Sequence, residues 1–293
     1  MLLGSIETGG TKFVCAVGDE NGKILEQVKF PTTTPEETME LAIEWFALKK
    51  MEAIGIACFG PIDLHPSSPT YGAITTTPKP GWGSYNIVHA VKDALHIPVG
   101  FDTDVNGSLL GEVTWGSAKG LSDVVYITIG TGIGAGILTN GRPLHGMLHP
   151  EAGHIMIPRR TDDTFEGVCP YHGTCFEGLA SGPSIEKRWG RPASELVNVP
   201  EVWDLEAYYI AEAISIYICT LSPQRIILGG GVMHQEQLFP LIRAKVSEMI
   251  HGYIQTEEMQ HLDTYIVPAS LQDNQGIMGG LKLAYDAGKN QNI

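Results

Sequence analysis

Hydrophobic residues along this chain form short continuous runs that alternate with stretches in which they recur at helical spacing. Three predominantly apolar runs, Ile54–Phe59, Val124–Ile129 and Arg225–Leu228, are each followed directly by glycine. Such runs are typical of strands that are buried on both faces and lead into a tight turn. We therefore expect these segments to lie inside a parallel or mixed sheet.

Helical spacing is clearest after Thr34, which is followed by a proline and, three residues on, by Glu37. A threonine cap, a proline at the first helical position and a glutamate at the third signal a helix start. The apolar positions that then recur are Leu41, Ala42, Trp45, Phe46 and Leu48. Further helices are expected at 85–95, 204–221 and about 276–287. Strands that alternate with helices predict an α/β fold, with mixed sheets covered by helices.

Glycine-rich turns follow three of the expected strands, at 8–12, 130–136 and 229–231. Glycine lets the backbone approach a phosphate group closely, and threonine hydroxyls can donate to phosphate oxygens. Taken singly, each turn could equally be an ordinary hairpin, and none has the P-loop pattern. Three such turns after apolar strands favour phosphate binding, because α/β folds place ligands at strand ends. The match of Ile129–Gly132 to Ile6–Gly9 also suggests two related halves.

Length and charge narrow the class of protein. A chain of 293 residues with 43% hydrophobic residues suits two folded domains that share a cleft. Its net charge of −14 argues against a nucleic-acid partner, which clustered lysine and arginine would bind. No apolar run approaches the roughly 18 residues that span a membrane, and no basic leader precedes the first strand, so we expect a cytoplasmic protein. Five cysteines do not suggest a disulfide framework.

A carboxylate pair stands where the strand at 96–101 gives way to a helix. The segment reads Asp102-Thr103-Asp104-Val105-Asn106. The partial positive charge of a helix N-terminus favours an ionised aspartate there. Helix capping is the ordinary role of such residues. If Asp102 or Thr103 is the cap, Asp104 is left for catalysis.

His154, Cys169, His172 and Cys175 have the spacing H-x14-C-x2-H-x2-C. Zinc prefers four nitrogen or sulfur ligands in a tetrahedron, and the two-residue spacers let one short loop supply three of them. Because no fifth ligand is at hand, we expect a structural zinc site. Glu151 and Glu177 flank the cluster. Held by a rigid loop they would suit sugar hydroxyls, although solvated surface glutamates are the commoner case.

Taken together, these motifs resemble the ROK family of sugar kinases, within the actin/hexokinase-like superfamily. The resemblance runs from Ile6–Lys12 to Gly276–Gly280 and is most specific at 102–106, 131–136 and 151–154 with the cysteine loop. The chain is most similar to bacterial fructokinases, which share Thr77–Trp82 and the Cys-x2-His-Gly-x-Cys-x-Glu loop. The resemblance implies a two-domain, ribonuclease H-like ATPase fold with a cleft between the domains.

The family pattern also implies domain limits and residue roles. We expect a small domain at 1–113, with a C-terminal helix at about 279–293 packing back on it, and a large domain at 114–278 that carries the zinc loop. Asp104 falls on the catalytic base. The implied sugar contacts are Thr103, Glu151, His154 and Glu177. The implied phosphate turns comprise Gly9, Gly10, Thr11, Lys12, Thr131 and Gly132. The implied nucleoside side comprises Pro183, Gly230, Gly231 and Val232.

The implied activity is transfer of the γ-phosphoryl group of ATP, with Mg²⁺, to the 6-hydroxyl of a hexose, most simply D-fructose, by a homodimeric enzyme. Glucose, mannose and N-acetylhexosamines remain alternatives. Three positions depart from the family. Glu7 replaces an aspartate thought to position Mg²⁺, Thr103 replaces an asparagine that touches the sugar, and His172 replaces a cysteine. A sugar-responsive repressor would carry a DNA-binding extension before the first turn, and a binding module without catalysis would not need Asp104.

Overall fold

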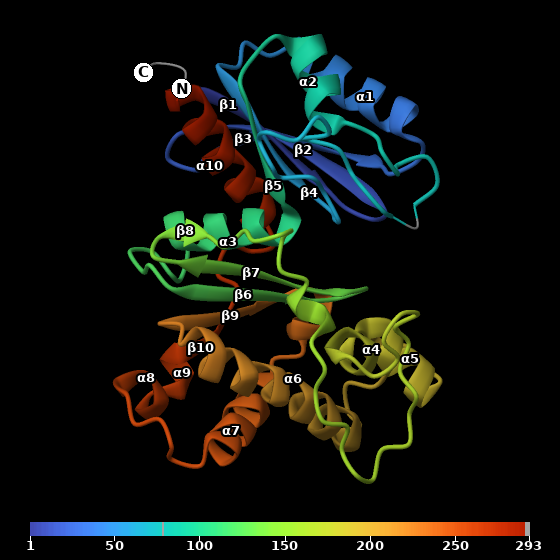
Figure 1. Ribbon diagram of the computed structural model, residues 1–293, viewed down its shortest axis with the longest axis vertical. Coiled ribbons are helices and arrows are strands. Elements are labelled where there is room, and N and C mark those ends of the chain that lie inside the picture. The colour runs from blue at the N-terminus through green and yellow to red at the C-terminus, as the bar shows by residue number, and fades with distance from the viewer. Residues whose placement is uncertain (78, 291–293) are drawn as a thin grey trace. The chain divides into compact units, whose positions relative to one another are not determined.

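The computed structural model describes residues 1–77 and 79–290 and divides into two compact units (Figure 1). Unit 1 comprises residues 1–120, 143–150 and the chain from Ser270 onward, and unit 2 comprises 121–142 and 151–269. Pro78 of the fructokinase-like motif and residues 291–293 of the expected C-terminal helix lie outside the described residues.

Unit 1 is built on a five-stranded sheet in the order β3-β2-β1-β4-β5. The strands are β1 (Leu2–Thr8), β2 (Lys12–Asp19), β3 (Ile24–Pro31), β4 (Ala53–Cys58) and β5 (Val99–Thr103). The first three strands pair antiparallel, and β1, β4 and β5 run parallel. In the parallel register Glu7 pairs with Ala57, and Ala57 pairs with Asp102. The carboxyl ends of β1 and β5 therefore come out at the same edge of the sheet.

Helices cover both faces of this sheet. They are α1 (Pro35–Ala47), α2 (Ile87–Leu95), α3 (Asp104–Thr114) and α10 (Gln275–Asn290). One face packs on α1 and α2 through a core that includes Phe13, Phe46 and Val88. On the other face, α10 packs directly on β4 and α3. At Gly55 the contact leaves no room for a side chain, because a Cβ atom there would overlap the carbonyl of Gly280.

Unit 2 contains a second five-stranded sheet in the order β10-β9-β6-β7-β8. Its strands are β6 (Val124–Ile129), β7 (Ile133–Thr139), β8 (Arg142–Pro143), β9 (Arg225–Gly229) and β10 (Ile266–Pro268). Its helices are α4 (Phe176–Ala180), α5 (Gly182–Trp189), α6 (Pro200–Leu221), α7 (Leu238–Ile250), α8 (Glu257–Gln260) and α9 (Leu262–Tyr265). Short 3-10 turns lie at Ala152–His154, Ala193–Glu195 and Gly231–His234. The long apolar helix α6 packs against α7 and α4.

The two sheets repeat one topology. Read from the other edge, the second order is β8-β7-β6-β9-β10, which matches β3-β2-β1-β4-β5 strand for strand. In each sheet the first strand of the repeat pairs antiparallel with the next strand in sequence and parallel with a later one. The short sequence match at Ile6–Gly9 and Ile129–Gly132 therefore marks equivalent turns, and the expected α/β class is confirmed.

The local signals for helices are met with small shifts. Helix α1 starts at Pro35, and the Thr34 hydroxyl accepts the backbone N–H of Glu37 at 3.3 Å, as its start signal predicted. Helix α6 begins four residues before the expected Asp204, because Pro200 occupies the first helical turn. Among the described helices, none combines the length and apolar character needed to cross a membrane.

Candidate active site

The glycine turn of unit 1 joins β1 to β2 at one edge of the sheet. The backbone N–H of Gly9 donates to the carbonyl of Lys12 at 2.9 Å. A Cβ atom at Gly9 would lie 2.7 Å from that carbonyl oxygen, so the turn requires glycine. Thr32, directly after the neighbouring strand β3, stabilises the turn because its hydroxyl donates to the Gly9 carbonyl at 2.8 Å. Gly10, Thr11 and Lys12 are left exposed at the tip.

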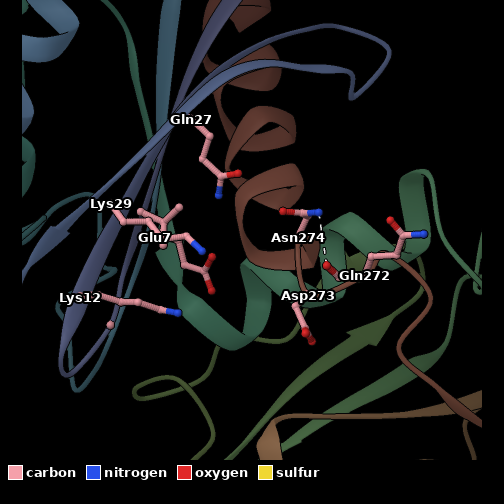
Figure 2. Close-up of a pocket in the computed structure, with 9 residues that line it drawn as sticks. Glu7, Lys12, Gln27, Lys29, Gln272, Asp273 and Asn274 are labelled. Carbon is pink, nitrogen blue, oxygen red and sulfur yellow. Dashed lines mark hydrogen bonds between the residues drawn. The ribbon is translucent and has the colours of Figure 1, made fainter. Parts of the chain in front are cut away.

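A polar pocket of about 380 Å³ opens beside this turn. Figure 2 shows its labelled side chains, which come from β1, β2 and β3 and from the segment before α10. The side chains that matter for charge are Glu7, Lys12, Lys29 and Asp273. Burial, and then the negative charge of Asp104, raises the pKa of Glu7 to about 7, against the opposing charge of Lys12. Glu7 is therefore poised to gain or lose its proton near neutrality.

Asp104 is the first residue of α3 and directly follows β5. The cap is Thr103, whose hydroxyl accepts the backbone N–H of Asn106 at 3.2 Å. Of the two residues that the sequence offered as caps, Asp102 and Thr103, the cap is thus Thr103. Asp104 is partly exposed, whereas Asp102, Thr103 and Asn106 are buried. Its Oδ1 accepts the N–H of Val105 at 2.9 Å, which keeps the carboxylate at the helix N-terminus, where negative charge is favoured.

Two histidines outside the motifs of the sequence, His145 and His149, lie against this strand end. The Nε2 atom of His145 is 3.1 Å from both carboxylate oxygens of Asp102, and Nδ1 of His149 is 3.5 Å from the Asn106 amide nitrogen. Asn106 also donates to Asp102 at 2.8 Å. The hydrogen bond to Asp102 raises the pKa of His145. The chain carries no local signal for these contacts, since they join residues 43 positions apart.

In unit 2, the second glycine turn contacts two other segments that were predicted to bind the nucleotide, the start of α5 and residues 230–232. The N–H of Gly130 donates to the Gly132 carbonyl at 2.9 Å, which closes the turn. At its base, the N–H of Gly182 donates to the Gly130 carbonyl at 2.8 Å and brings up the start of α5, where Pro183 is exposed. Gly230 has φ 89° and packs so tightly on Ile129 that a Cβ atom would overlap it. Gly231 and Val232 therefore follow directly beside the turn.

The four predicted metal ligands also come together in unit 2. Their ligand atoms all lie within 4.8 Å of one another. Nδ1 of His154 is 3.7 Å from the sulfur of Cys169 and 3.5 Å from that of Cys175, and Nδ1 of His172 is 3.6 Å from Cys169. Tetrahedral zinc with bonds of about 2.0 Å to nitrogen and 2.3 Å to sulfur needs ligand separations of roughly 3.3–3.8 Å. The residues present therefore fit a zinc ion.

Of the two glutamates expected beside the metal ligands, Glu177 lies close to the His154 ring, and Glu151 immediately precedes the 3-10 turn that carries His154. Glu177 lies in the first turn of α4, with Oε1 3.9 Å from Nε2 of His154. The pKa of Glu151 is raised by partial burial, opposed by His154, and raised further by the charge of Glu177. Sequence reasoning had not anticipated that Glu177 Oε2 accepts the N–H of Ile133 at 2.9 Å, next to the glycine turn.

Each unit therefore assembles part of the predicted site. In unit 1 the structure brings the strand end at 102–106 into register with the β1–β2 turn, with Glu7 beside it. In unit 2, Glu177 joins the turn at 130–133 to the metal loop, the segment 169–175 that carries three of the four predicted ligands. Gly182 joins the same turn to the start of α5. The positions predicted to contact sugar are Thr103 in unit 1 and Glu151, His154 and Glu177 in unit 2.

Comparison with known proteins gives a consistent family assignment. The model of the ROK family matches residues 3–287. A Bacillus subtilis relative is 53% identical over 98% of this chain and 96% of its own length. The fructokinase of Pediococcus pentosaceus is 47% identical over 99% of this chain and 100% of its own. The crystal structure of a ROK hexokinase from Thermus thermophilus, 25% identical, matches 99% of this chain and 100% of that chain with a TM-score of 0.81. The chain belongs to the ROK family and has its actin/hexokinase-like fold.

Proposed function

We propose that this protein is an ATP:hexose 6-phosphotransferase whose substrate is D-fructose. Relatives that are 43–47% identical over nearly the whole chain are named fructokinase. The observation that carries the proposal is the position of Asp104. Thr103 caps the helix, and Asp104 follows it as a partly exposed carboxylate at the start of α3, next to the end of β5.

Asp104 acts as the general base in this proposal. The sugar 6-oxygen attacks the γ-phosphorus of ATP. The bond between the γ-phosphorus and the β–γ bridging oxygen breaks, so that ADP leaves. Asp104 accepts the proton of the 6-hydroxyl, a contribution typically worth about 10²- to 10⁴-fold in rate. The exposed turn at Gly9, Gly10, Thr11 and Lys12 and the turn at Thr131 and Gly132 hold phosphate oxygens through backbone N–H groups. Mg²⁺, when bound with ATP, neutralises phosphate charge.

The sugar contacts are proposed to be Thr103, Glu151, His154 and Glu177. Glu177 supports this assignment, because it lies near the His154 ring, whose other nitrogen faces the metal ligands, and Glu151 immediately precedes the turn that carries His154. The donor set His154, Cys169, His172 and Cys175 would hold a structural Zn²⁺. Pro183, Gly230, Gly231 and Val232 form the nucleoside side. The homodimer and the cytoplasmic location expected from the sequence remain part of this proposal.

The test is a panel of hexoses assayed for ADP release with the purified protein. We expect D-fructose to give the highest kcat/KM, and the phosphorylated product to carry its phosphate on the 6-oxygen. A higher kcat/KM with glucose or mannose would replace fructose as the substrate and keep the kinase assignment. ATP turnover that no hexose stimulates would reject the kinase assignment itself.

A further inference from the structure

Glu177 is the one acidic side chain that reaches both the metal loop and the glycine turn of unit 2, among the contacts of the described residues. Its Oε2 accepts the backbone N–H of Ile133 at 2.9 Å. Its Oε1 lies 3.9 Å from Nε2 of His154, whose Nδ1 faces the sulfur atoms of Cys169 and Cys175. A continuous path of contacts therefore runs from the metal ligands through His154 and Glu177 to the turn.

The contact with the turn leaves little freedom. A Cβ atom at Gly132 would lie 2.8 Å from Glu177 Oε2, so the carboxylate packs on the turn as well as bonding to it. A second close approach comes from Gly153, where a Cβ atom would overlap the carbonyl of Ile133. The segment that carries His154 thus packs on the same residue to which Glu177 binds. A displacement of the metal loop would be transmitted to Ile133.

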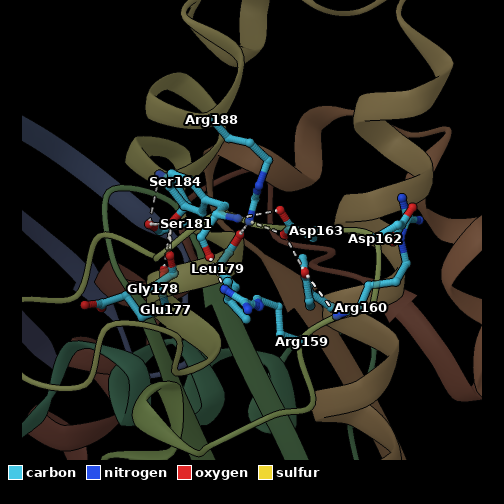
Figure 3. Close-up of polar contacts among 12 residues, drawn as sticks. Arg159, Arg160, Asp162, Asp163, Glu177, Gly178, Leu179, Ser181, Ser184 and Arg188 are labelled. Carbon is cyan, nitrogen blue, oxygen red and sulfur yellow. Dashed lines mark hydrogen bonds and ion pairs between the residues drawn. The ribbon is translucent and has the colours of Figure 1, made fainter.

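Helix α4, which carries Glu177, is held in place from behind (Figure 3). At five residues it is too short to be stable by itself. The hydroxyl of Ser184 donates to the carbonyls of Glu177 and Gly178, each at 3.0 Å. The guanidinium group of Arg188 donates to the carbonyl of Leu179 at 2.9 Å. The carbonyls of Glu177 and Gly178 also accept the backbone N–H groups of Ser181 at 3.2 Å and Val168 at 3.0 Å, so α5 adds further hydrogen bonds to a helix end that is already bonded.

Arg188 is itself fixed by buried neighbours. It lies 3.3 Å from Asp163, and both side chains are 8% exposed. Its guanidinium group also packs 4.3 Å from the centre of the Phe165 ring. A buried ion pair with a stacked arginine restricts the position of the residues it contacts. Helix α4 can therefore act as a rigid link, with its metal ligand Cys175 immediately before it and Glu177 in its first turn.

We propose that Glu177 is a positioning residue that couples the histidine–cysteine metal site to the glycine turn at 130–133, so that an occupied metal site strengthens nucleotide binding. The inference rests on the proposed role of this turn in holding phosphates. A carboxylate next to a metal-ligating histidine orients its ring. Here the other oxygen of that carboxylate orients the turn. The turn presents its N–H groups to phosphate best when the metal ligands hold His154, and His154 in turn holds Glu177, in the positions seen in the structure.

The experiment measures ADP binding by calorimetry in the presence of Mg²⁺ and the absence of sugar. Wild-type protein is compared with Glu177→Ala and Glu177→Gln, all at full zinc occupancy verified by metal analysis. Glu177→Ala should raise the Kd for ADP by about 5- to 10-fold, within the usual range of coupling between sites. Glu177→Gln should also weaken ADP binding, but less than Glu177→Ala, because its amide oxygen can still accept the N–H of Ile133 whereas its amide nitrogen cannot accept a hydrogen bond from Nε2–H of His154. The matched control Glu186→Ala, an exposed glutamate on α5, should leave the Kd unchanged.

A second arm removes zinc from the wild-type protein with a chelator and confirms by circular dichroism that it remains folded. ADP should then bind about 5- to 10-fold more weakly, and zinc removal should add no weakening to Glu177→Ala. If Glu177→Ala in the zinc-loaded protein binds ADP within twofold of wild type, the coupling is wrong. The comparison of Glu177→Ala with wild type uses only zinc-loaded protein, so it decides the question even if the chelated protein unfolds.

The role of the turn is tested separately with Thr131→Glu, which places a carboxylate at its exposed tip. If the turn holds phosphates, this variant should bind ADP at least about tenfold more weakly, because like charges repel at short range. An unchanged Kd would overturn the phosphate role and the coupling together. Weaker binding by Thr131→Glu with normal binding by Glu177→Ala would overturn the coupling alone. A purely sugar-binding role for Glu177 also predicts normal ADP binding, since no sugar is present.

Discussion

The imidazole Nε2 of His145 lies 3.1 Å from both carboxylate oxygens of Asp102, which is buried at the end of β5. The segment that carries His145 is held at a second point, where His65 Nε2 is 2.7 Å from the carbonyl of Met147. Asp102 lies two residues before Asp104. The segment at 143–150 leads directly into Glu151. The pair therefore fixes the strand end from which the proposed base emerges.

This pair predicts a pH-dependent contribution to stability. Its hydrogen bond raises the pKa of His145, so the stabilisation is complete below the ordinary histidine pKa of about 6.5 and is lost as pH rises through the higher folded value. His145→Gln should therefore destabilise the protein at pH 6 more than at pH 9, measured by urea unfolding. His89→Gln, at an exposed histidine on α2, is the control. An equal loss at both pH values would contradict the ion pair.

Glu7 predicts a second pH effect through its raised pKa. Burial raises that pKa to about 7, so the folded state holds this proton more tightly than the unfolded chain does. The resulting stabilisation is present below the ordinary glutamate pKa and is lost as pH rises through about 7. Glu7→Gln should remove on the order of 2 kcal/mol of the wild-type stability change between pH 5 and pH 8. Identical unfolding curves against pH for the two proteins would show that Glu7 does not titrate in this range.

Asp104→Asn tests the proposed base. The amide keeps the shape of the side chain and cannot accept the hydroxyl proton as a base. We expect kcat to fall about 10²- to 10⁴-fold, while the Kd values for sugar and ADP change little. Single-turnover kinetics with calorimetric binding checks both. A variant that keeps a tenth of the wild-type kcat would remove Asp104 from this role.

The metal site predicts a loss of stability when a ligand is removed. Cys169→Ser replaces a thiolate ligand with a poor one, and zinc binding is linked to folding. The variant should lose its zinc, and its Tm should fall below that of the wild type. Cys219→Ser is the matched control, since Cys219 is exposed on α6 and lies outside the ligand cluster. Metal analysis and differential scanning fluorimetry measure the two effects. Full zinc content in Cys169→Ser would refute the ligand assignment.

Glu112 predicts a large stability effect at a site far from the sequence motifs. Its fully buried carboxylate accepts the backbone N–H groups of Ser117 at 2.9 Å and Ser270 at 2.6 Å, and both serine hydroxyls. Glu112→Ala removes an acceptor from each of these donors, although the Ser117 N–H also donates to Oγ of Ser270 at 2.9 Å, and should cost roughly 3 kcal/mol of unfolding free energy. Ser270→Ala, which removes a single hydroxyl, should cost about 1 kcal/mol. Equal losses in the two variants would show that the carboxylate is not the centre of this network.

Local patterns were sufficient for much of the fold. The start of α1 follows from Thr34, Pro35 and Glu37, because a cap and a first turn involve only neighbouring residues. The apolar runs at 54–59 and 124–129 became β4 and β6, since a strand buried on both faces needs an unbroken apolar sequence. The start of α6 was misplaced because Val199, the residue before its first turn, offers no side-chain cap to mark it.

By itself, the sequence determined which chemical groups the protein possesses and how they are spaced: the H-x14-C-x2-H-x2-C ligand set, the glycine turns, and Asp104 after a strand. Only the tertiary structure decided which of them touch. The contacts of His145 with Asp102 and of Glu177 with Ile133 join residues 43 and 44 positions apart. Spacing along a chain governs contacts within a turn or two, whereas such distant pairs depend on strand register and helix packing, which arise only when the whole core assembles.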